Sequence, residues 1–235
     1  MDDRPTLLWM ACGACSGESM AILGAEGRGK RGDTLPGFLD EHDVRLLWHP
    51  SLSLESPRQA AALIERIVAG EQRLTLLCVE GSIIHGPNGS GRFDIFEGRP
   101  KRDVVAELCE RAEYVLAMGS CAAYGGIPAA APNPSESTGL QYTNREPGGL
   151  LTREWRSRAG MPVVNLSACP VDATTMIETM GSLLEGRERV ETVGPFPAST
   201  MRHARDHEQS IGIVDLPRSA IHLEHALVVP DACAG

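Results

Sequence analysis

The chain has 235 residues, of which 42% are hydrophobic and 23% are charged, so it can fill a core and is not expected to be disordered. It carries 22 Lys and Arg against 31 Asp and Glu, a net charge of −9, which argues against a nucleic-acid or anionic-membrane binder. No apolar stretch approaches the roughly 18–20 residues that span a bilayer, and no signal peptide precedes the first apolar run. We therefore expect a cytoplasmic protein without a transmembrane segment, which reaches a membrane only through partners.

Short apolar runs alternate with helical patterns over residues 1–186, which is typical of a parallel sheet with crossover helices. In chain order we predict a strand at 6–10, a helix from about Gly17 that includes 20–23, a strand at 44–48, a helix at 57–69, a strand at 74–79, a helix at 101–112, strands at 114–118 and 162–166, and a helix at 173–184. The pattern indicates an α/β fold, a flavodoxin-like open parallel sheet with helices on both faces. Residues 187–235 form a C-terminal extension whose structure the pattern does not define.

Two long connections, residues 85–100 and 125–160, are rich in Gly and Pro and follow the carboxyl ends of predicted strands. A compact domain rarely keeps loops of this length without a function. Because parallel strands end at the same edge of a sheet, we expect both loops to lie on that edge.

Four of the seven cysteines also follow predicted strands: Cys12 and Cys15 the first, Cys121 the fourth and Cys169 the fifth. The odd count and the size of the chain argue against a disulfide scaffold. Open α/β sheets bind ligands at the carboxyl ends of their strands. Four thiolates that converge from three loops are the ligand set of a [4Fe–4S] cluster.

Other interpretations of the cysteines remain open at this point. Four cysteines also suit structural zinc, although closed zinc sites usually take two local pairs. Cys12 and Cys15 alone fit a thioredoxin-like redox pair, which leaves Cys121 and Cys169 without a role. Cys78 and Cys109 are expected to be small hydrophobic residues of the core, and Cys233 to be a free thiol or incidental.

Four motifs, in this order, resemble the small, electron-transferring subunit of the [NiFe] hydrogenases over about residues 6–186. They are Cys-Gly-Ala-Cys-Ser-Gly-Glu at 12–18, Glu-Gly-Ser-Ile at 80–83, Gly-Ser-Cys-Ala-Ala-Tyr-Gly-Gly-Ile-Pro-Ala at 119–129 and Ala-Cys-Pro at 168–170. Residues 80–100 and 132–149 are similar to the actinobacterial branch of uptake hydrogenases. Some members of that branch lack the first cysteine of the pair, which is present here as Cys12.

The resemblance implies one proximal [4Fe–4S] cluster with Cys12, Cys15, Cys121 and Cys169 as ligands. It places the Ni–Fe centre in a separate, obligate large subunit, so no catalytic residue is expected in this chain, and electrons pass on to a further iron–sulfur or flavin protein. Glu18 and Glu80 are expected beside the cluster at the subunit face. Two interpretations of Glu18 remain open. It has a role in the subunit face or in proton movement, or it is an exposed carboxylate in the first turn of a helix, stabilised by the helix dipole. Glu80 is expected to orient a loop through hydrogen bonds.

One departure from the resemblance concerns the medial and distal clusters, which typical small subunits bind in a second, cysteine-rich domain. After Pro170 the sequence has only Cys233 and four histidines, of which His203 and His207 are interpreted as an exposed pair. A single cluster is therefore expected. The alternatives are a regulatory hydrogen sensor, the cluster subunit of respiratory NADH dehydrogenase, which has two adjacent cysteines, and a stand-alone flavodoxin-like or thioredoxin-like redox protein.

Overall fold

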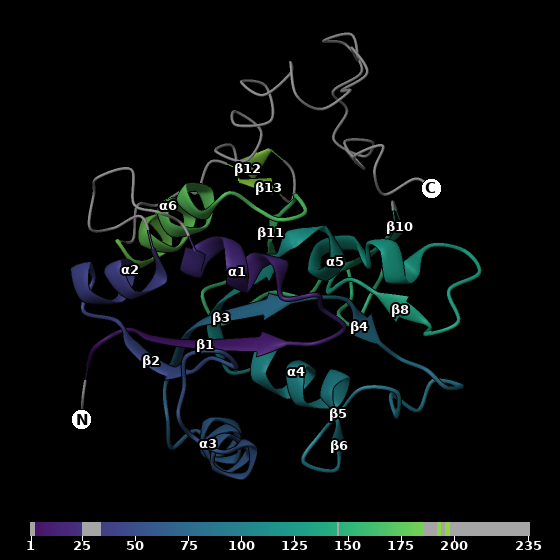
Figure 1. The fold of residues 1–235 in the computed structure, drawn as a ribbon, viewed down its shortest axis with the longest axis horizontal. Helices are drawn as coiled ribbons and strands as arrows, with labels where there is room; N and C mark the ends of the chain where they lie inside the picture. The colour runs from purple at the N-terminus through teal and green to yellow at the C-terminus, as the bar shows by residue number, and fades with distance from the viewer. Residues whose placement is uncertain (1–2, 25–33, 145, 186–191, 194–195, 198–235) are drawn as a thin grey trace, which may run out of the picture.

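A computed structural model describes residues 3–24, 34–144, 146–185, 192–193 and 196–197. At its centre is a five-stranded parallel sheet with the strand order β11-β7-β3-β1-β2 (Figure 1). The strands are β1 Thr6–Ala11, β2 Arg45–Trp48, β3 Leu74–Glu80, β7 Ala112–Met118 and β11 Val164–Leu166. This is the flavodoxin-like order, with the first strand between the second and the third along the chain. The predicted α/β fold is confirmed.

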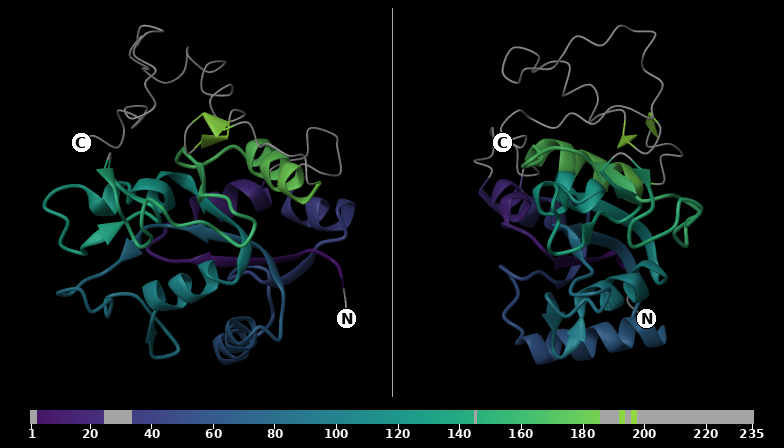
Figure 2. Two further views of the ribbon diagram at one scale, coloured as in Figure 1. Left: turned by 180° about the vertical axis from the view of Figure 1, so that it is seen from behind. Right: turned by 90° about the vertical axis from the view of Figure 1, so that its right-hand side faces the viewer.

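Helices cover both faces of the sheet (Figures 1 and 2). On one face lie α1 Gly17–Gly24, α2 Leu35–Glu41 and α6 Ala173–Leu184, whose buried side chains share a core with Trp9. On the other face lie α3 Pro57–Ala69 and α4 Lys101–Cys109, whose core includes Met10. Neighbouring strand residues point to opposite faces, so β1 contributes alternately to the two cores.

Local sequence explains where the predicted helices begin and end. Ser56 and Gln59 form a capping box at the start of α3, and Gly70, with a φ of 82°, ends it. Asp172 accepts hydrogen bonds from the first turn of α6. The helix predicted at 101–112 ends at Cys109, because β7 already begins at Ala112.

The two long connections are ordered through short pairings. Strand β4, Ile83–Ile84, pairs with β8, Ser137–Thr138, so that the two connections lie side by side. The Glu136 carboxylate also accepts hydrogen bonds from the backbone N–H groups of Asn88 and Gly89, at 2.6 and 2.7 Å. The remaining short elements are β5 Ile95–Phe96, β6 Arg99–Pro100, α5 Gly119–Tyr124, the 3₁₀ helix η1 Ile127–Ala129, β9 Tyr142–Thr143 and β10 Glu146–Pro147.

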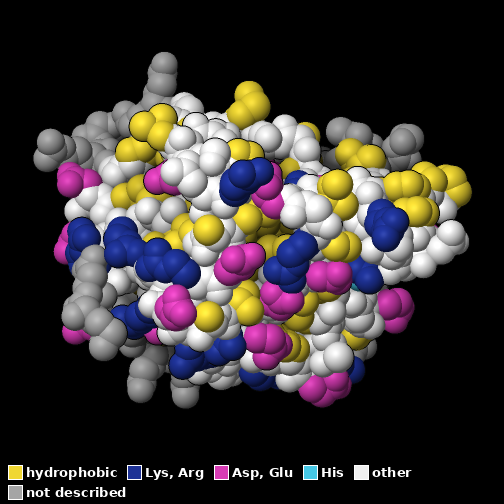
Figure 3. All heavy atoms as spheres, turned by 90° about the horizontal axis from the view of Figure 1, so that it is seen from below, with side chains coloured by type: hydrophobic (Ala, Val, Ile, Leu, Met, Phe, Trp, Pro, Cys, Tyr) yellow, Lys and Arg dark blue, Asp and Glu magenta, His cyan; other side chains and the backbone are white. Residues whose placement is uncertain are grey.

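Beyond α6, the described residues form one short antiparallel pair, β12 Thr192–Val193 with β13 Phe196–Pro197. The rest of the predicted extension, with Cys233 and the histidines His203 and His207, lies outside the described residues. Within the described part of the chain, no helix has the length and hydropathy needed to cross a bilayer. On the face seen from below, which carries α3 and α4, positive and negative side chains are interspersed (Figure 3).

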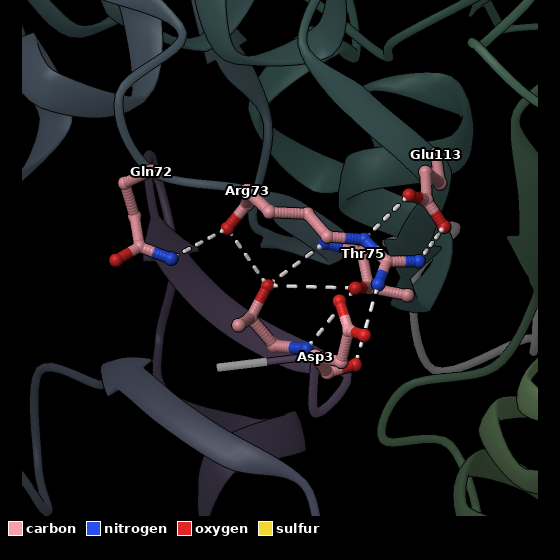
Figure 4. Close-up of polar contacts among 6 residues, drawn as sticks. Asp3, Gln72, Arg73, Thr75 and Glu113 are labelled. Atoms are coloured by element: carbon pink, nitrogen blue, oxygen red, sulfur yellow. Dashed lines mark hydrogen bonds and ion pairs between the residues drawn. The ribbon is translucent and has the colours of Figure 1, made fainter. Parts of the chain in front are cut away.

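The edge at which the strands begin is fixed by polar contacts (Figure 4). The Arg73 guanidinium donates to both carboxylate oxygens of Glu113, at 2.8 and 3.1 Å. Thr6 and Thr75 exchange backbone and hydroxyl hydrogen bonds across β1 and β3, at 3.0 and 3.1 Å. These contacts join the beginnings of β1, β3 and β7, at the end of the sheet opposite to the cysteines described below.

Candidate metal centre

All four predicted ligands follow strands that end at the same edge of the sheet, here called the carboxyl edge; Cys12 comes directly after β1. Cys15 lies between β1 and α1, Cys121 lies in α5 directly after β7, and Cys169 follows β11. The Ser120 N–H donates to the Ala168 carbonyl oxygen at 2.9 Å and so joins the segments that carry Cys121 and Cys169.

The segment that carries Cys15 reaches the same place. A Cβ added at Gly17 would lie 3.3 Å from Cys15 Sγ and 3.8 Å from Pro170 Cβ. The Gly17 backbone therefore lies between the first cysteine segment and the turn that follows Cys169. Cys15, Cys121 and Cys169 are called the three edge cysteines below.

The three edge cysteines influence one another electrostatically. The pKa of Cys121 is raised to about 11, first by burial, then by the neighbouring Cys169 and Glu18, with a smaller contribution from Cys15. The Ile127 N–H opposes these effects with a hydrogen bond to the Cys121 sulfur. Cys15 and Cys169 are exposed and Cys121 is half-buried. Thiols with N–H donors beside them are the donor set of iron–sulfur centres.

Cys12, the fourth predicted ligand, is buried, whereas Cys15 and Cys169 are exposed. The alternation of β1 directs its side chain to the face that α3 and α4 cover, where it joins a buried core. Its pKa is raised to about 12, first by burial and then by Asp94, while Lys101 acts in the opposite direction. Among the described residues, no three His, Cys, Asp or Glu side chains are placed to hold one metal ion.

Beneath the carboxyl edge, Lys101 and Asp94 form a mostly buried ion pair. Lys101 Nζ lies 2.8 Å from Asp94 Oδ1 and donates to the carbonyl oxygen of Ala11 at 3.0 Å. Their side chains are 20% and 14% exposed, so water screens the pair only partly. This contact fixes the end of β1 directly before Cys12.

Glu80, at the end of β3, is completely buried rather than exposed at a surface. Its carboxylate accepts hydrogen bonds from Trp9 Nε1–H at 2.9 Å, from Ser19 Oγ–H at 2.5 Å, and from the backbone N–H groups of Glu18 and Ser19 at 3.2 and 3.3 Å. Four donors fill the acceptor capacity of a carboxylate, which is what a buried charge without a cation requires.

Glu18 lies in the first turn of α1, as expected, but its side chain is only 7% exposed. Burial raises its pKa to about 7, and the contact with Glu80 adds to the shift. Its carboxyl group lies against Gly119 at the start of α5, where a Cβ would overlap the Glu18 side chain. Glu18 therefore connects the beginning of α1 to the helix that carries Cys121.

The charged and polar residues that support this edge have no recognisable signal in the sequence. Asp94 belongs to a long connection and Lys101 to the start of α4. Only the folded loop brings them beneath β1. His49, which follows β2, lies 3.5 Å from Ser19 Oγ and was not singled out. The burial of Cys12, by contrast, could have been found, because Leu8, Met10 and Cys12 alternate along β1.

Comparisons with known proteins agree with this arrangement. A profile of the family described as "NADH ubiquinone oxidoreductase, 20 Kd subunit" matches residues 12–183. The F420 non-reducing hydrogenase II small subunit of Methanosarcina mazei is 25% identical over 214 residues, which are 85% of this chain and 53% of that protein. The quinone-reactive Ni/Fe-hydrogenase small chain of Wolinella succinogenes is 28% identical over 172 residues, 72% of this chain and 42% of that protein. This chain thus spans about half the length of the curated relatives it matches.

Among solved structures, the actinobacterial-type NiFe-hydrogenase from Ralstonia eutropha H16 matches with a TM-score of 0.65 and 29% identity, over 77% of this chain and 53% of that chain. The family profile covers most of the chain, and the relatives that match are hydrogenase small subunits, as the sequence motifs predicted. The chain therefore belongs to the family of the 20 Kd subunit of NADH ubiquinone oxidoreductase, and its homologues are small subunits of hydrogenases, oxidoreductases that act on hydrogen.

Proposed function

We propose that this chain is the small subunit of a [NiFe] hydrogenase and transfers electrons between the Ni–Fe centre of a large subunit and a further redox partner. The observation that carries the proposal is the convergence of the three edge cysteines from β1, β7 and β11 on one edge of the sheet. The names of the relatives support the class of reaction. Hydrogen is oxidised in the large subunit, and this chain contributes no ligand to that centre.

The proposed cofactor is one proximal [4Fe–4S] cluster, which takes up and releases single electrons when bound. Cys15, Cys121 and Cys169 supply three thiolates, and the Ile127 N–H donates to the Cys121 sulfur. Such N–H···S hydrogen bonds stabilise the thiolate and tune the site. Gly17 and Gly126 allow the backbone to approach the sulfurs closely.

Cys12 is proposed as the fourth ligand because it completes the motif at the end of β1. Its side chain is buried, and the charged groups that act on it are Asp94, Lys101 and Glu80, so this ligand is assigned from the motif and not from its position. A Cys12→Ser variant tests the assignment separately from the other three. Loss of the cluster supports a four-cysteine set, and a cluster retained with unchanged spectra removes Cys12 from it.

The proposed docking surface for the large subunit is the carboxyl edge. Met20 in α1 and Ile127 after α5 are 71% and 58% exposed, and both follow an edge cysteine closely in the chain. Large exposed apolar side chains beside a redox site favour an obligate interface.

A second partner, an iron–sulfur or flavin protein, receives the electrons. The free thiols of Cys12, Cys15, Cys78 and Cys109 favour a reducing compartment, the cytoplasm.

The test is iron and acid-labile sulfide per chain in the complex purified anaerobically with its large subunit, together with an EPR spectrum. About four of each, and hydrogen-dependent reduction of a dye, are expected. A complex that oxidises hydrogen at full rate while this chain contains no iron would overturn the proposal.

A further inference from the structure

The buried carboxylate of Glu80 connects the end of β3 to β1 and to the first turn of α1, which lie about 60 to 70 residues earlier in the sequence. Its donors are the Trp9 indole, which lies on β1, and three groups in the first turn of α1: the Ser19 hydroxyl and the N–H groups of Glu18 and Ser19. The carboxylate itself stands at the end of β3, the neighbour of β1 in the sheet. Every one of these contacts is buried.

Glu80 acts on α1 in the way that an N-cap side chain acts on its own helix. The first N–H groups of a helix have no acceptor within the helix and form the positive end of its dipole. Ser16, directly before α1, has a φ of 65°, whereas a capping residue is usually extended. Glu80 supplies the missing acceptors from a different strand, and it does so with a negative charge.

The first turn of α1 is also the place where the three cysteine segments meet. A Cβ added at Gly17 would lie 3.3 Å from Cys15 Sγ and 3.8 Å from Pro170 Cβ, so the Gly17 backbone lies close to both cysteine segments. Glu18 lies against Gly119, two residues before Cys121. A displacement of this turn therefore changes the position of Cys15 relative to Cys121 and Cys169.

We propose that Glu80 is a positioning residue that fixes the first turn of α1 and, through it, the arrangement of the three edge cysteines. Glu80 acts through the hydrogen bonds that it accepts from the backbone N–H groups of Glu18 and Ser19 and from the Ser19 hydroxyl. The proposal rests on the proposed function only in so far as the three thiols hold a cluster.

The test compares Glu80→Gln with Ser19→Ala and with Glu113→Gln, all in the complex with the large subunit. Glutamine keeps the size of the side chain but replaces one acceptor oxygen with an N–H₂ group, which cannot accept the hydrogen bonds of the two donors at that oxygen. Glu113→Gln removes the ion pair with Arg73 at the opposite edge of the sheet (Figure 4), and so controls for the loss of a carboxylate.

In Glu80→Gln, hydrogen exchange of the Glu18 and Ser19 amides is expected to accelerate about tenfold or more, because hydrogen bonds to a charged acceptor are lost. The EPR line shape and midpoint potential of the cluster are expected to shift as well. Ser19→Ala should move the same signals less, and Glu113→Gln should move neither.

Wild-type exchange in α1, or a wild-type EPR spectrum in the folded Glu80→Gln complex, would overturn the proposal. If Glu80→Gln does not assemble, Ser19→Ala is used in its place. Wild-type hydrogen exchange and a wild-type EPR spectrum in Ser19→Ala would then overturn the proposal. A wild-type complex without iron would refute the proposed function instead, and the exchange comparison would still test the role of Glu80.

Discussion

Gly126 lies directly against Cys121: a Cβ added at Gly126 would be 2.5 Å from Cys121 Sγ and 2.9 Å from its Cα. The φ of 55° at Gly126 is also one that L-residues rarely adopt. Gly126→Ala is therefore expected to displace the Cys121 side chain and to lower the iron content of the complex by more than half, in line with the cost of overpacking.

Gly98→Ala is the matched control for this prediction. Gly98 has a φ of 82°, but nothing lies within 4 Å of its added Cβ. This variant carries the backbone strain without the contact and should keep its iron, with a free energy of unfolding lower by about 1 kcal/mol. Equal iron loss in both variants would show that strain, and not the sulfur contact, matters.

Cys121→Ser is expected to remove or convert the cluster and to reduce dye-linked hydrogen oxidation to background, because a serine hydroxyl is a poor ligand for iron in place of a thiolate. Visible absorbance and EPR of the anaerobic complex measure the change. Cys78→Ala is the control, since Cys78 is buried within β3 beside Met180 and should affect only stability. Full activity and absorbance in Cys121→Ser would contradict the ligand assignment.

Lys101→Met is expected to lower the free energy of unfolding by about 2–4 kcal/mol, because it leaves the largely buried Asp94 carboxylate without its cation. It also removes the hydrogen bond to Ala11 directly before Cys12. Urea unfolding measures the effect.

Arg99→Met tests whether burial decides this cost. Arg99 and Glu107 form an ion pair of 2.6 Å, but both side chains are about 40% exposed, so less than about 1 kcal/mol is expected. A similar loss for the two variants would contradict the role assigned to burial.

His49 is expected to make the protein less stable in mild acid. Burial lowers its pKa from 6.5 to about 4, and its Nδ1 accepts a hydrogen bond from the Ser51 N–H at 3.0 Å, which a protonated imidazole cannot do. The unfolded state therefore binds the proton more readily between pH 6.5 and 4, and stability falls as pH decreases through that window.

The pH prediction is checked by urea midpoints at pH 7 and pH 5. Glu18 acts in the opposite direction, because its raised pKa of about 7 lets the folded state take up a proton first and so gain stability as pH decreases. The contribution of His49 is therefore measured as a difference: between pH 7 and pH 5 the wild type should lose more stability, or gain less, than His49→Gln. His42→Gln serves as the control, because His42 is partly exposed and stacks on Phe38. An unchanged dependence in His49→Gln would assign the acid sensitivity to other groups.

The helices and the five sheet strands could be predicted because each carries its own signal. The helix at 173–184 has its cap, its apolar spacing and its bounds in the local sequence, and the structure agrees. Helix α2 was missed, although Thr34 and Pro36 mark its beginning, because seven residues offer only two buried positions, Leu35 and Phe38. The two-residue strands β4 and β8 have no periodicity, and only contacts between distant segments define them.

The candidate site was predictable in outline for a similar reason. A cysteine after a buried strand belongs to the carboxyl edge of a parallel sheet, which places Cys15, Cys121 and Cys169. Cys12 continues the alternation of Leu8 and Met10 along β1, so its burial could also be predicted from the sequence. The hydrogen bonds of Glu80 depend on strand order, which places β3 beside β1.

The order of the strands in the sheet also constrains when the site can form. Cys169 follows β11, which is the last of the five strands to leave the ribosome and, among the described residues, pairs with β7 alone at the margin of the sheet. A nascent chain that ends before residue 169 contains Cys15 and Cys121 but not Cys169. If the proposed cluster takes Cys169 as a ligand, it can be completed only after β11 has joined the sheet, so cluster loading would report that all five strands are in place.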